Sequence, residues 1–230
     1  YTMLLKYYQK FDDALSYLLS SVCDEKKLIK SLFKKSKITY VDIGTNEGNF
    51  LEYLLKFCNF NKIICFEPIE ELANQLKDKF NNKKIEIYSE ALSNKSSLKK
   101  FYEYQISSQS SLYKQNDTFK SLKNLKNISI IKTRSFDEIF KGKKKIDFCK
   151  IDVQGEEVKV LQGMKKNLKL KNIKLIKIEI SFIERYQGSK SNFFEIISYL
   201  IKFNYHLVSI SKIKYRNNKI LLMDAYFLLK

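Results

Sequence analysis

The sequence has few of the residues that hold transition metals or form disulfides. Its 230 residues include one histidine, and its four cysteines, at positions 23, 58, 65 and 149, show no C-x-x-C spacing. A structural zinc site needs about four nitrogen or sulfur ligands, so we predict no metal centre and keep a carboxylate-bound magnesium as the alternative. Three of the cysteines lie within apolar patterns, where we expect reduced thiols that pack as small hydrophobic side chains.

Long apolar runs are also missing. The longest stretches without a charged residue are 14–23 and 104–113, far shorter than the roughly 18 to 20 apolar residues of a membrane helix. We therefore expect no membrane span. No leader with a basic start and an apolar core is visible, although the chain starts with tyrosine and a leader could have been removed. These features predict a cytoplasmic protein.

Proline and glycine are scarce, with one and six residues. No Pro/Gly-rich linker therefore separates two large domains. Apolar residues recur at helical spacing from Leu4 to Val22, with charged residues mostly off that stripe. We predict an N-terminal helical cap over residues 1–35 and a single larger domain over residues 36–230.

Arginine is rare although the chain is strongly basic. The sequence has 43 lysine and arginine residues against 25 acidic ones, a formal net charge of +18, but its only arginines are Arg134, Arg185 and Arg216. Bidentate recognition of phosphates and bases favours arginine. The lysine excess therefore indicates a compositional bias, which argues against a nucleic-acid partner without excluding one. An acidic or phosphorylated substrate would also suit the charge.

Short apolar strands alternate with helical stretches along most of the chain. Strands are predicted at 38–43, 62–66, 84–88, 146–151 and 173–180, and helices near 48–58, 69–80, 156–168 and 191–203. This alternation is typical of an α/β fold with a parallel sheet covered on both faces. Two further strands, at 205–210 and 223–229, would complete a mostly parallel seven-stranded sheet with an antiparallel hairpin.

An irregular insertion at 97–133 interrupts the alternation. It contains strands near 98–104 and 128–132 and a Ser/Gln-rich loop at 105–116. Long loops in compact domains commonly form binding or lid elements. We expect this loop, together with the segment 181–189, to shape a substrate pocket.

The first predicted strand runs into the motif Asp42-x-Gly44-x-x-x-Gly48. Glycine permits a sharp turn and a close approach of a ligand to the backbone. Ligands of open α/β sheets lie outside the carboxyl ends of the strands, where acidic residues follow the other strands, namely Glu67, Glu90, Asp152 and Glu179. Clustered carboxylates need a compensating cation, and the sulfonium and ammonium groups of S-adenosylmethionine would provide it. Glu67 would accept hydrogen bonds from the two ribose hydroxyls.

Other enzyme motifs are absent or out of context. The turn lacks the G-x-G-x-x-G spacing of dinucleotide sites. Tyr186 and Lys190 have the Tyr-x-x-x-Lys spacing of short-chain dehydrogenases, but Gly188 and Ser189 lie between them, so we expect a loop there. The Asn/Asp-Pro-Pro-aromatic motif of amino-group methyltransferases cannot occur because the only proline is Pro68. An oxygen nucleophile is therefore favoured.

Taken together, these motifs resemble the FkbM-type family of S-adenosylmethionine-dependent O-methyltransferases. The matching segments are Val41–Gly48, Phe66–Pro68, Ala91–Ser93, Ser110–Leu112, Phe148–Glu157, Leu161–Gly163, Ile178–Glu179 and Asp224–Phe227. The family often has alanine at the place of Thr45 and glutamate at the place of Gln154. The glutamine puts a general-base role at that position in doubt but not a positioning role.

The resemblance implies a Rossmann-like class I methyltransferase fold and methyl transfer to a hydroxyl of a sugar, glycan or related metabolite. The residues expected to bind S-adenosylmethionine are Asp42, Gly44, Asn46, Gly48, Glu67, Glu90, Ala91 and Asp152. Asp152 is the first choice for the catalytic base or orienting group, followed by Glu157 and Glu179. Glu157 has a structural alternative, because the helix dipole favours an acid in the first turn. His206 is expected to be structural.

Two other functions stay open. RNA ribose 2′-O-methyltransferases arrange two lysines, an Asp and a Glu around the target hydroxyl, which Lys150, Asp152, Lys177 and Glu179 would have to match. We expect both lysines to point away from these acids or to be displaced along their strands. A non-catalytic module that retains the fold and the cofactor is the other alternative. The sequence does not indicate an oligomeric state.

Overall fold

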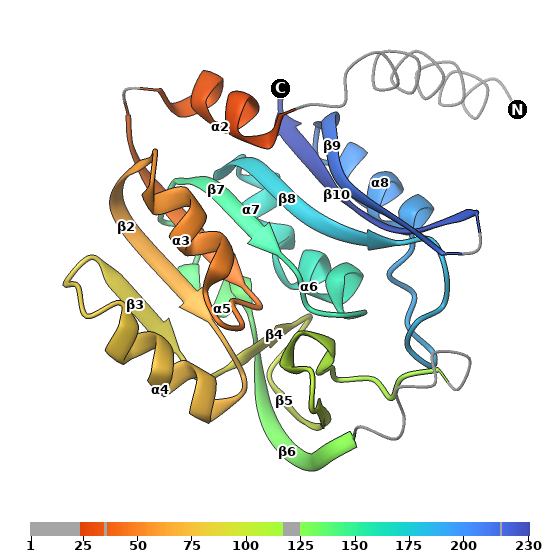
Figure 1. Cartoon of the computed structure of the whole chain (residues 1–230). Helices are drawn as coiled ribbons and strands as arrows, with labels where there is room; N and C mark the ends of the chain where they lie inside the picture. Colours follow the sequence, from red (N-terminus) through yellow and green to blue (C-terminus); the bar gives the residue numbers. More distant parts are fainter. Residues whose placement is uncertain (1–23, 35, 117–124, 217) are drawn as a thin grey trace, which may run out of the picture.

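The structure is a computed structural model that describes residues 24–34, 36–116, 125–216 and 218–230. The main sheet consists of β1 (Lys37–Ile43), β2 (Asn59–Phe66), β3 (Ile85–Tyr88), β7 (Ile146–Ile151), β8 (Ile173–Ser181), β9 (Tyr205–Arg216) and β10 (Lys219–Leu229). Its strand order is β3-β2-β1-β7-β8-β10-β9 (Figure 1). The first five strands of this order are parallel, and β10 is antiparallel to both of its neighbours. The predicted seven-stranded architecture with its closing hairpin is confirmed.

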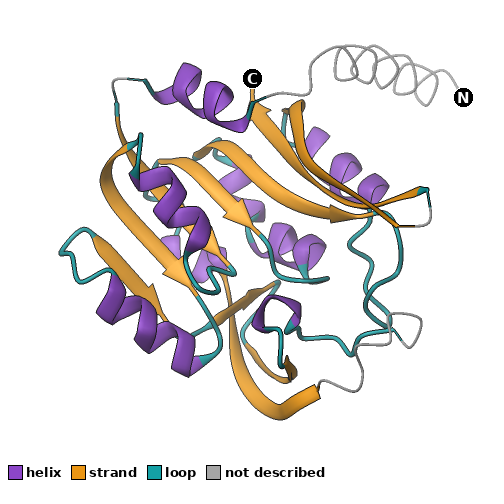
Figure 2. Cartoon of the chain, viewed as in Figure 1, coloured by secondary structure: helices purple, strands orange, loops and turns teal. Residues whose placement is uncertain are grey.

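Helices cover both faces of this sheet (Figure 2). They are α2 (Glu25–Phe33), α3 (Asn49–Leu55), α4 (Glu70–Lys79), α5 (Phe136–Phe140), α6 (Glu157–Gly163), α7 (Lys165–Lys169) and α8 (Phe193–Ile201). One apolar core joins α2 and α3 to the sheet, and the other joins α5, α6, α7 and α8 to the opposite face. No helix within the described residues is long and apolar enough to cross a membrane.

The burial of both faces of the sheet explains the nearly continuous apolar sequence of its strands. In β1, Tyr40 contributes to the core under α2 and α3, whereas Val41 and Ile43 contribute to the opposite core. Successive side chains of a strand point to opposite faces, so a strand that is covered on both sides has an almost continuous apolar sequence. Asp42 is the acidic residue of β1, and it is fully buried.

The helix α2 shows how the segment before β1 joins the fold. Asp24 caps it, because its carboxylate accepts a hydrogen bond from the backbone amide of Lys26 at 3.0 Å. Ile29 and Phe33, one helical turn apart, are buried in the same core as Tyr40. The apolar stripe from Leu4 to Val22 lies outside the described residues. The division into a cap and a larger domain stays a prediction.

The insertion forms a small second sheet instead of two isolated strands. Its strands are β4 (Ala91–Ser93), β5 (Ser97–Tyr104) and β6 (Leu125–Ser135), in the order β4-β6-β5, and the short 3₁₀ helix η1 (Ser107–Gln109) follows β5. The strand β4 was not predicted, and β6 is longer than expected. Short strands of this kind depend on partners that are distant in the sequence.

The prediction of a single helix at 156–168 is wrong in one respect. The structure has two helices there, α6 and α7, which meet at Met164. Met164 has φ −99° and ψ 2°, outside the helical range. Just before it, Gly163 packs directly on β4, where an added Cβ would lie 2.1 Å from the carbonyl oxygen of Ser93. Periodicity in the sequence does not reveal such a contact between elements.

Candidate active site

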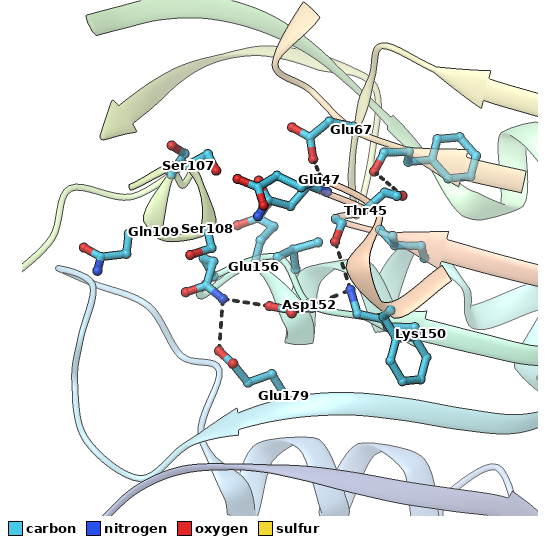
Figure 3. A pocket seen from close by; sticks show the side chains of 18 of the residues that line it. Thr45, Glu47, Glu67, Ser107, Ser108, Gln109, Lys150, Asp152, Glu156 and Glu179 are labelled. Carbon is cyan, nitrogen blue, oxygen red and sulfur yellow. Dashed lines mark hydrogen bonds and ion pairs between the residues drawn. The ribbon is translucent and has the colours of Figure 1, made fainter. Parts of the chain in front are cut away.

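A cavity of about 770 Å³ lies at the carboxyl ends of the parallel strands. We call its two ends the cofactor half and the acceptor half. The cofactor half is lined by Gly44, Thr45, Asn46, Glu47, Glu67, Pro68, Ile69, Glu90, Ala91 and Leu92. The acceptor half is lined by Glu25, Lys177, Glu179, Arg185, Ser211, Lys212, Lys214, Leu222 and Asp224. Lys150, Asp152 and Gln154 lie between them (Figure 3).

The turn after β1 has the geometry that its glycines suggested. Gly44 has φ +82°, and an added Cβ would lie 1.9 Å from the carbonyl oxygen of Asp152. Its backbone amide donates to the carbonyl of Phe66 at 3.0 Å, which ties the turn to the end of β2. Gly48 has φ +79° and precedes α3, but it does not line the cavity. The first glycine is therefore the one that brings two strand ends together.

Glu67 closes the same turn from β2. Its two carboxylate oxygens accept backbone amides, Asn46 at 2.7 Å and Ile69 at 3.0 Å. Each oxygen keeps a further lone pair for a ligand hydroxyl. Burial raises the pKa of Glu67 to about 7, although the two amide hydrogen bonds oppose this change. This arrangement suits a pair of ribose hydroxyls.

A polar atom that the protein leaves unpaired also points to a ligand in this half. The side-chain oxygen of Asn46 is buried and has no hydrogen-bond partner among the described residues. Asn46 itself has φ +51°, a conformation that asparagine tolerates better than most residues. Buried polar atoms are nearly always hydrogen-bonded in native proteins, so a bound polar ligand would complete this site.

The insertion contributes the far end of the cofactor half. Glu90 lines the cavity and forms an ion pair with Arg134 of β6 at 3.1 Å, and Ala91 lies next to it. Phe101 of β5 and Leu112 also line the cavity, and the residues of η1 lie over it (Figure 3). Sequence reasoning found the loop but missed Phe101, because β5 is held in place by its pairing with β6, which lies more than 20 positions later in the chain.

Lys150 corrects one prediction about the strand ends. We expected its side chain to point away from Asp152 or to be displaced. Its ammonium group instead lies 3.6 Å from the carboxylate of Asp152, 3.1 Å from that of Asp42 and 2.9 Å from the carbonyl oxygen of Gly44. Burial opposes its charge, but Asp42 and Asp152 raise the pKa of Lys150 above its ordinary value. Lys150 is therefore a buried cation that joins β1 to β7.

Asp42 lies behind this cation and does not line the cavity. It is fully buried, and its position follows from the register, because Asp42 pairs with Lys150 across β1 and β7. Burial raises the pKa of Asp42, and Lys150 opposes this shift. The structure thus places Asp42 where it holds Lys150, while its predicted role in cofactor binding stays a prediction.

Gln154 joins the two acids that end β7 and β8. Its amide nitrogen donates to Asp152 at 2.7 Å and to Glu179 at 3.0 Å, and its amide oxygen accepts the hydroxyl of Tyr186 at 2.8 Å. Carboxylates only accept and the tyrosine hydroxyl donates, so this network fixes the orientation of the amide. Arg185 donates to Glu179 at 3.1 Å. Gln154 thus has the contacts of a positioning residue.

The two acids differ in charge state. Burial, followed by the charge of Asp152, raises the pKa of Glu179 to about 8. Burial also disfavours the charge of Asp152, but Lys150 and the Gln154 amide outweigh it and lower the pKa of Asp152 below its ordinary value. The cavity therefore contains two neighbouring acids whose pKa values are shifted in opposite directions.

Glu157 lies outside the main cavity. It accepts the backbone amides of Gly155, at 3.0 Å, and of Val153, at 3.2 Å, and it faces a smaller neighbouring cavity of about 260 Å³. Burial raises its pKa to about 7. Its hydrogen bonds hold the turn in which Gln154 has φ +53°. The position matches the structural alternative, and the catalytic role stays a prediction.

Two loops that were expected to shape the pocket are hydrogen-bonded to each other. The amide of Asn116 donates to the carbonyl of Arg185 at 2.8 Å, and that of Gln187 donates to Lys114 at 2.9 Å. The hydroxyl of Tyr186 also contacts the carbonyl of Gln109 at 3.0 Å. The insertion and the segment after β8 therefore form one wall of the site.

The acceptor half contains residues that sequence reasoning missed. As expected, Lys177 does not pair with Glu179. It pairs instead with Glu25 at 3.0 Å and with Asp224 at 2.7 Å. Glu25 also accepts the hydroxyl of Tyr226. The sequence contained only a partial signal, because Lys177 and Glu179 alternate with apolar residues in β8 and therefore lie on one face. His206 lies on β9 and does not line the cavity.

Comparisons with known proteins agree with this geometry. The model of the methyltransferase FkbM domain matches residues 42–207. The structure of methyltransferase FkbM from Methylobacillus flagellatus KT is similar with a TM-score of 0.54 and 16% identity, over 83% of this chain and 43% of that one. This chain therefore spans less than half the length of that protein. No curated protein matches the sequence significantly.

Two other methyltransferases share the fold. The N-methyltransferase NodS from Bradyrhizobium japonicum WM9 has a TM-score of 0.51 and 9% identity, over 89% of this chain and 93% of that one. An rRNA methylase from Streptococcus thermophilus has a TM-score of 0.50 and 10% identity, over 91% and 99%. The family match covers most of the chain, and the glycine turn, Glu67 and the unpaired Asn46 oxygen fit the cofactor. The chain therefore belongs to the methyltransferase FkbM family.

Proposed function

We propose that this enzyme transfers the methyl group to a hydroxyl of a sugar, glycan or related metabolite. The observation that supports this most directly is the position of Asp152. Its carboxylate lines the cavity between the cofactor half and the acceptor half, ionised and fixed by Lys150 and Gln154. An ionised acid at this point can orient a hydroxyl group and accept its proton.

The cofactor, when bound, supplies a methyl group on a positively charged sulfur, which is already a good leaving group. The protein residues bind and align it. In the proposed arrangement, Gly44 lets the turn pack against the end of β7, Glu67 accepts the ribose hydroxyls and the unpaired oxygen of Asn46 accepts a further donor. Glu90 and Ala91 would border the adenine.

Asp152 would act on the acceptor. Its oxygen Oδ1 is occupied by the Gln154 amide, and Oδ2 lies 3.6 Å from Lys150, so one side of Oδ2 is left for a hydroxyl. Alignment of reacting groups contributes about 7 to 11 kcal/mol, whereas a general base contributes about 10² to 10⁴ in rate. We expect alignment to dominate, with Lys150 and Gln154 as the groups that hold Asp152 and with Glu179 fixing Gln154.

A second candidate, an RNA ribose 2′-O-methyltransferase, is favoured only by the pairing of Lys150 with Asp152. The other half of such an arrangement does not form, because Lys177 pairs with Glu25 and Asp224. A nucleic-acid acceptor is therefore the weaker proposal. A cytoplasmic location is also part of the proposal, and the free thiols of Cys58, Cys65 and Cys149 support it.

The experiment compares two acids that serve different halves. In Glu67→Ala, we expect the dissociation constant of S-adenosylmethionine to rise at least about tenfold, because two hydrogen bonds to a charged group are lost. In Asp152→Asn, we expect cofactor binding to change by less than about threefold, while kcat falls by about 10² to 10⁴. Calorimetry measures binding, and release of S-adenosylhomocysteine with a panel of sugars measures turnover.

The matched control is Glu71→Gln, which removes an exposed acid whose ion pair with Lys126 is 3.6 Å long. It should change neither quantity. Mass spectrometry of the product shows whether the methyl group is on oxygen. Methylation on nitrogen, or full turnover in Asp152→Asn, would disprove the proposed chemistry.

A further inference from the structure

The strand β9 contains an irregularity where it borders the acceptor half. Asp224 of β10 pairs with Ser211, and Leu222 pairs with Lys214, so two residues of β9 lie opposite Met223 alone. One of these two is Lys212, which has φ +51°. Two residues opposite one define a β-bulge, a feature that is common next to active sites, where it redirects side chains.

The bulge changes which side chains face the cavity. In a regular strand, Ser211 and Lys212 would point to opposite faces. Both of them line the cavity, and so does Lys214. The left-handed conformation costs about 1 to 2 kcal/mol for a residue other than glycine. Strain of this kind is typical of functional sites, and here its result is that Ser211, Lys212 and Lys214 all line the same cavity.

The carboxylates of this half do not neutralise these lysines fully. Lys177 is the close partner of Glu25 and Asp224, at 3.0 and 2.7 Å, whereas Lys212 lies 4.0 and 3.7 Å from the same two carboxylates. Among the residues that the structure describes, Lys214 forms no ion pair with a carboxylate. Three ammonium groups therefore face two carboxylates, and the two outer ammonium groups are the least compensated.

The remaining charged pair of the acceptor half does not remove this excess. Arg185 forms an ion pair with Glu179 at 3.1 Å, so this carboxylate already has its own cation. Burial, followed by the neighbouring Lys177, also lowers the pKa of Lys212 below its ordinary value. An anion bound at this place would stabilise the charged form of Lys212.

The backbone of these lysines lies far from the cofactor half, and only the long side chain of Lys212 reaches back, to 5.3 Å from the Phe50 ring of α3. Gly44, Glu67 and Glu90 follow β1, β2 and β3, whereas Lys212 and Lys214 are on β9, at the opposite edge of the sheet. Four strand spacings separate β1 from β9, about 19 Å at the usual distance of roughly 4.8 Å per strand. Asp152 lies between the two groups.

We propose that the acceptor carries an anionic group, a carboxylate or a phosphate, and that Lys212 and Lys214 bind it while Asp152 contacts the hydroxyl. This inference rests on the proposed function and specifies its substrate class. Lysine binds such anions as a point charge through several hydrogen-bond donors. The anion would fix the acceptor at one end, so that the hydroxyl at the other end is aligned with the methyl group.

The test compares the binding of three matched probes to the complex with S-adenosylhomocysteine. They are methyl α-glucoside, which is neutral, methyl α-glucuronide, which has a carboxylate, and glucose 6-phosphate. We expect at least one anionic probe to bind about tenfold or more tightly than the neutral one, because a charged hydrogen bond is gained. The two anionic probes distinguish the carboxylate from the phosphate.

Two substitutions connect this preference to the bulge. Lys212→Asn removes the charge but keeps a residue that tolerates positive φ, so the bulge should be preserved, and Lys214→Gln removes the second charge. In the double variant, we expect the preference for the anion to fall at least about tenfold, with unchanged affinity for S-adenosylhomocysteine. Lys219→Gln, an exposed lysine of the same hairpin that does not line the cavity, should keep the preference.

Each other outcome identifies which proposal fails. If the glucoside and both anions bind alike, or none binds while S-adenosylhomocysteine does, the anion site is wrong and the methyltransferase proposal stands. If the double variant loses affinity for S-adenosylhomocysteine, the lysines bind the methionine carboxylate of the cofactor, and the inference is wrong. If the unmodified protein does not bind S-adenosylhomocysteine, the proposed function itself fails.

Discussion

The two halves of the cavity are built in different ways. In the cofactor half, backbone atoms of one turn make the site, with Gly44 against Asp152 and Glu67 on two backbone amides. In the acceptor half, the site is a set of charged side chains from α2, β8, β9 and β10. A cofactor with one fixed structure can use a rigid backbone cradle, whereas acceptor specificity depends on side chains that can change without altering the fold.

The largest expected effect tests the backbone turn of the cofactor half. In Gly44→Ala, the new Cβ would lie 1.9 Å from a backbone oxygen, and φ is +82°. Because the obstacle is backbone and not a flexible side chain, we expect the free energy of unfolding to fall by at least about 4 kcal/mol. Urea denaturation measures this change.

Gly188→Ala is the control for the conformational contribution alone. Gly188 has φ +73°, but a Cβ there would meet nothing within 4 Å. We expect a loss of only about 1 to 2 kcal/mol. Equal losses in the two variants would show that the contact between the Gly44 turn and Asp152 is not tight, which would remove the main difference between the halves.

The cofactor half could be predicted from the sequence because its signals are local. Gly44 and Gly48 have a fixed spacing, and Glu67 directly follows an apolar strand. The structure places Gly44 and Glu67 together at one turn. Gly48 also has the turn conformation that the motif predicted, but it lies at the start of α3 and does not line the cavity.

The acceptor half could not be predicted, for a physical reason. Lys177 and Glu25 are 152 positions apart in the sequence, and only the docking of α2 brings them together. The bulge at Lys212 depends on the register between β9 and β10. Lys150 was assigned the wrong direction because a strand end with two acids and a lysine has several possible pairings until the register is known.

The second prediction concerns the ion pairs that hold the acceptor half. Lys177→Met leaves the carboxylates of Glu25 and Asp224 buried with only a more distant Lys212 as a cation. Removal of one partner from a buried ion pair costs about 3 to 5 kcal/mol, so we expect a loss of this size in the free energy of unfolding. Denaturant unfolding with and without S-adenosylmethionine measures stability and cofactor binding together.

An exposed pair provides the comparison for Lys177. Lys126 and Glu71 are 3.6 Å apart, with exposed fractions of 58% and 69%. Lys126→Met should change stability by less than about 1 kcal/mol. We expect Lys177→Met, while folded, to bind S-adenosylmethionine as the unmodified protein does. Loss of cofactor binding without loss of stability would show that the two halves are not separate.

The smallest expected effect is a pH dependence of S-adenosylmethionine binding, which comes from Glu67 in the cofactor half. Burial raises the pKa of Glu67 to about 7, so this carboxyl group is ionised above that pH and protonated below it. Only the ionised form accepts both ribose hydroxyls, and the bound hydroxyls favour it in turn. If the protonated form does not bind, the apparent dissociation constant of S-adenosylmethionine rises about tenfold between pH 8 and pH 6. Calorimetry across this range measures the change.

Glu67→Gln isolates this effect from the other groups that titrate in the same range. Burial raises the pKa of Glu157 to about 7 and, together with Asp152, that of Glu179 to about 8, and both groups remain in the variant. We expect the variant to bind weakly at every pH, with the tenfold slope removed. A slope that persists in Glu67→Gln and disappears in Glu179→Gln would place the titrating group in the acceptor half. The cofactor would then depend on both halves, and the backbone turn alone could not explain its affinity.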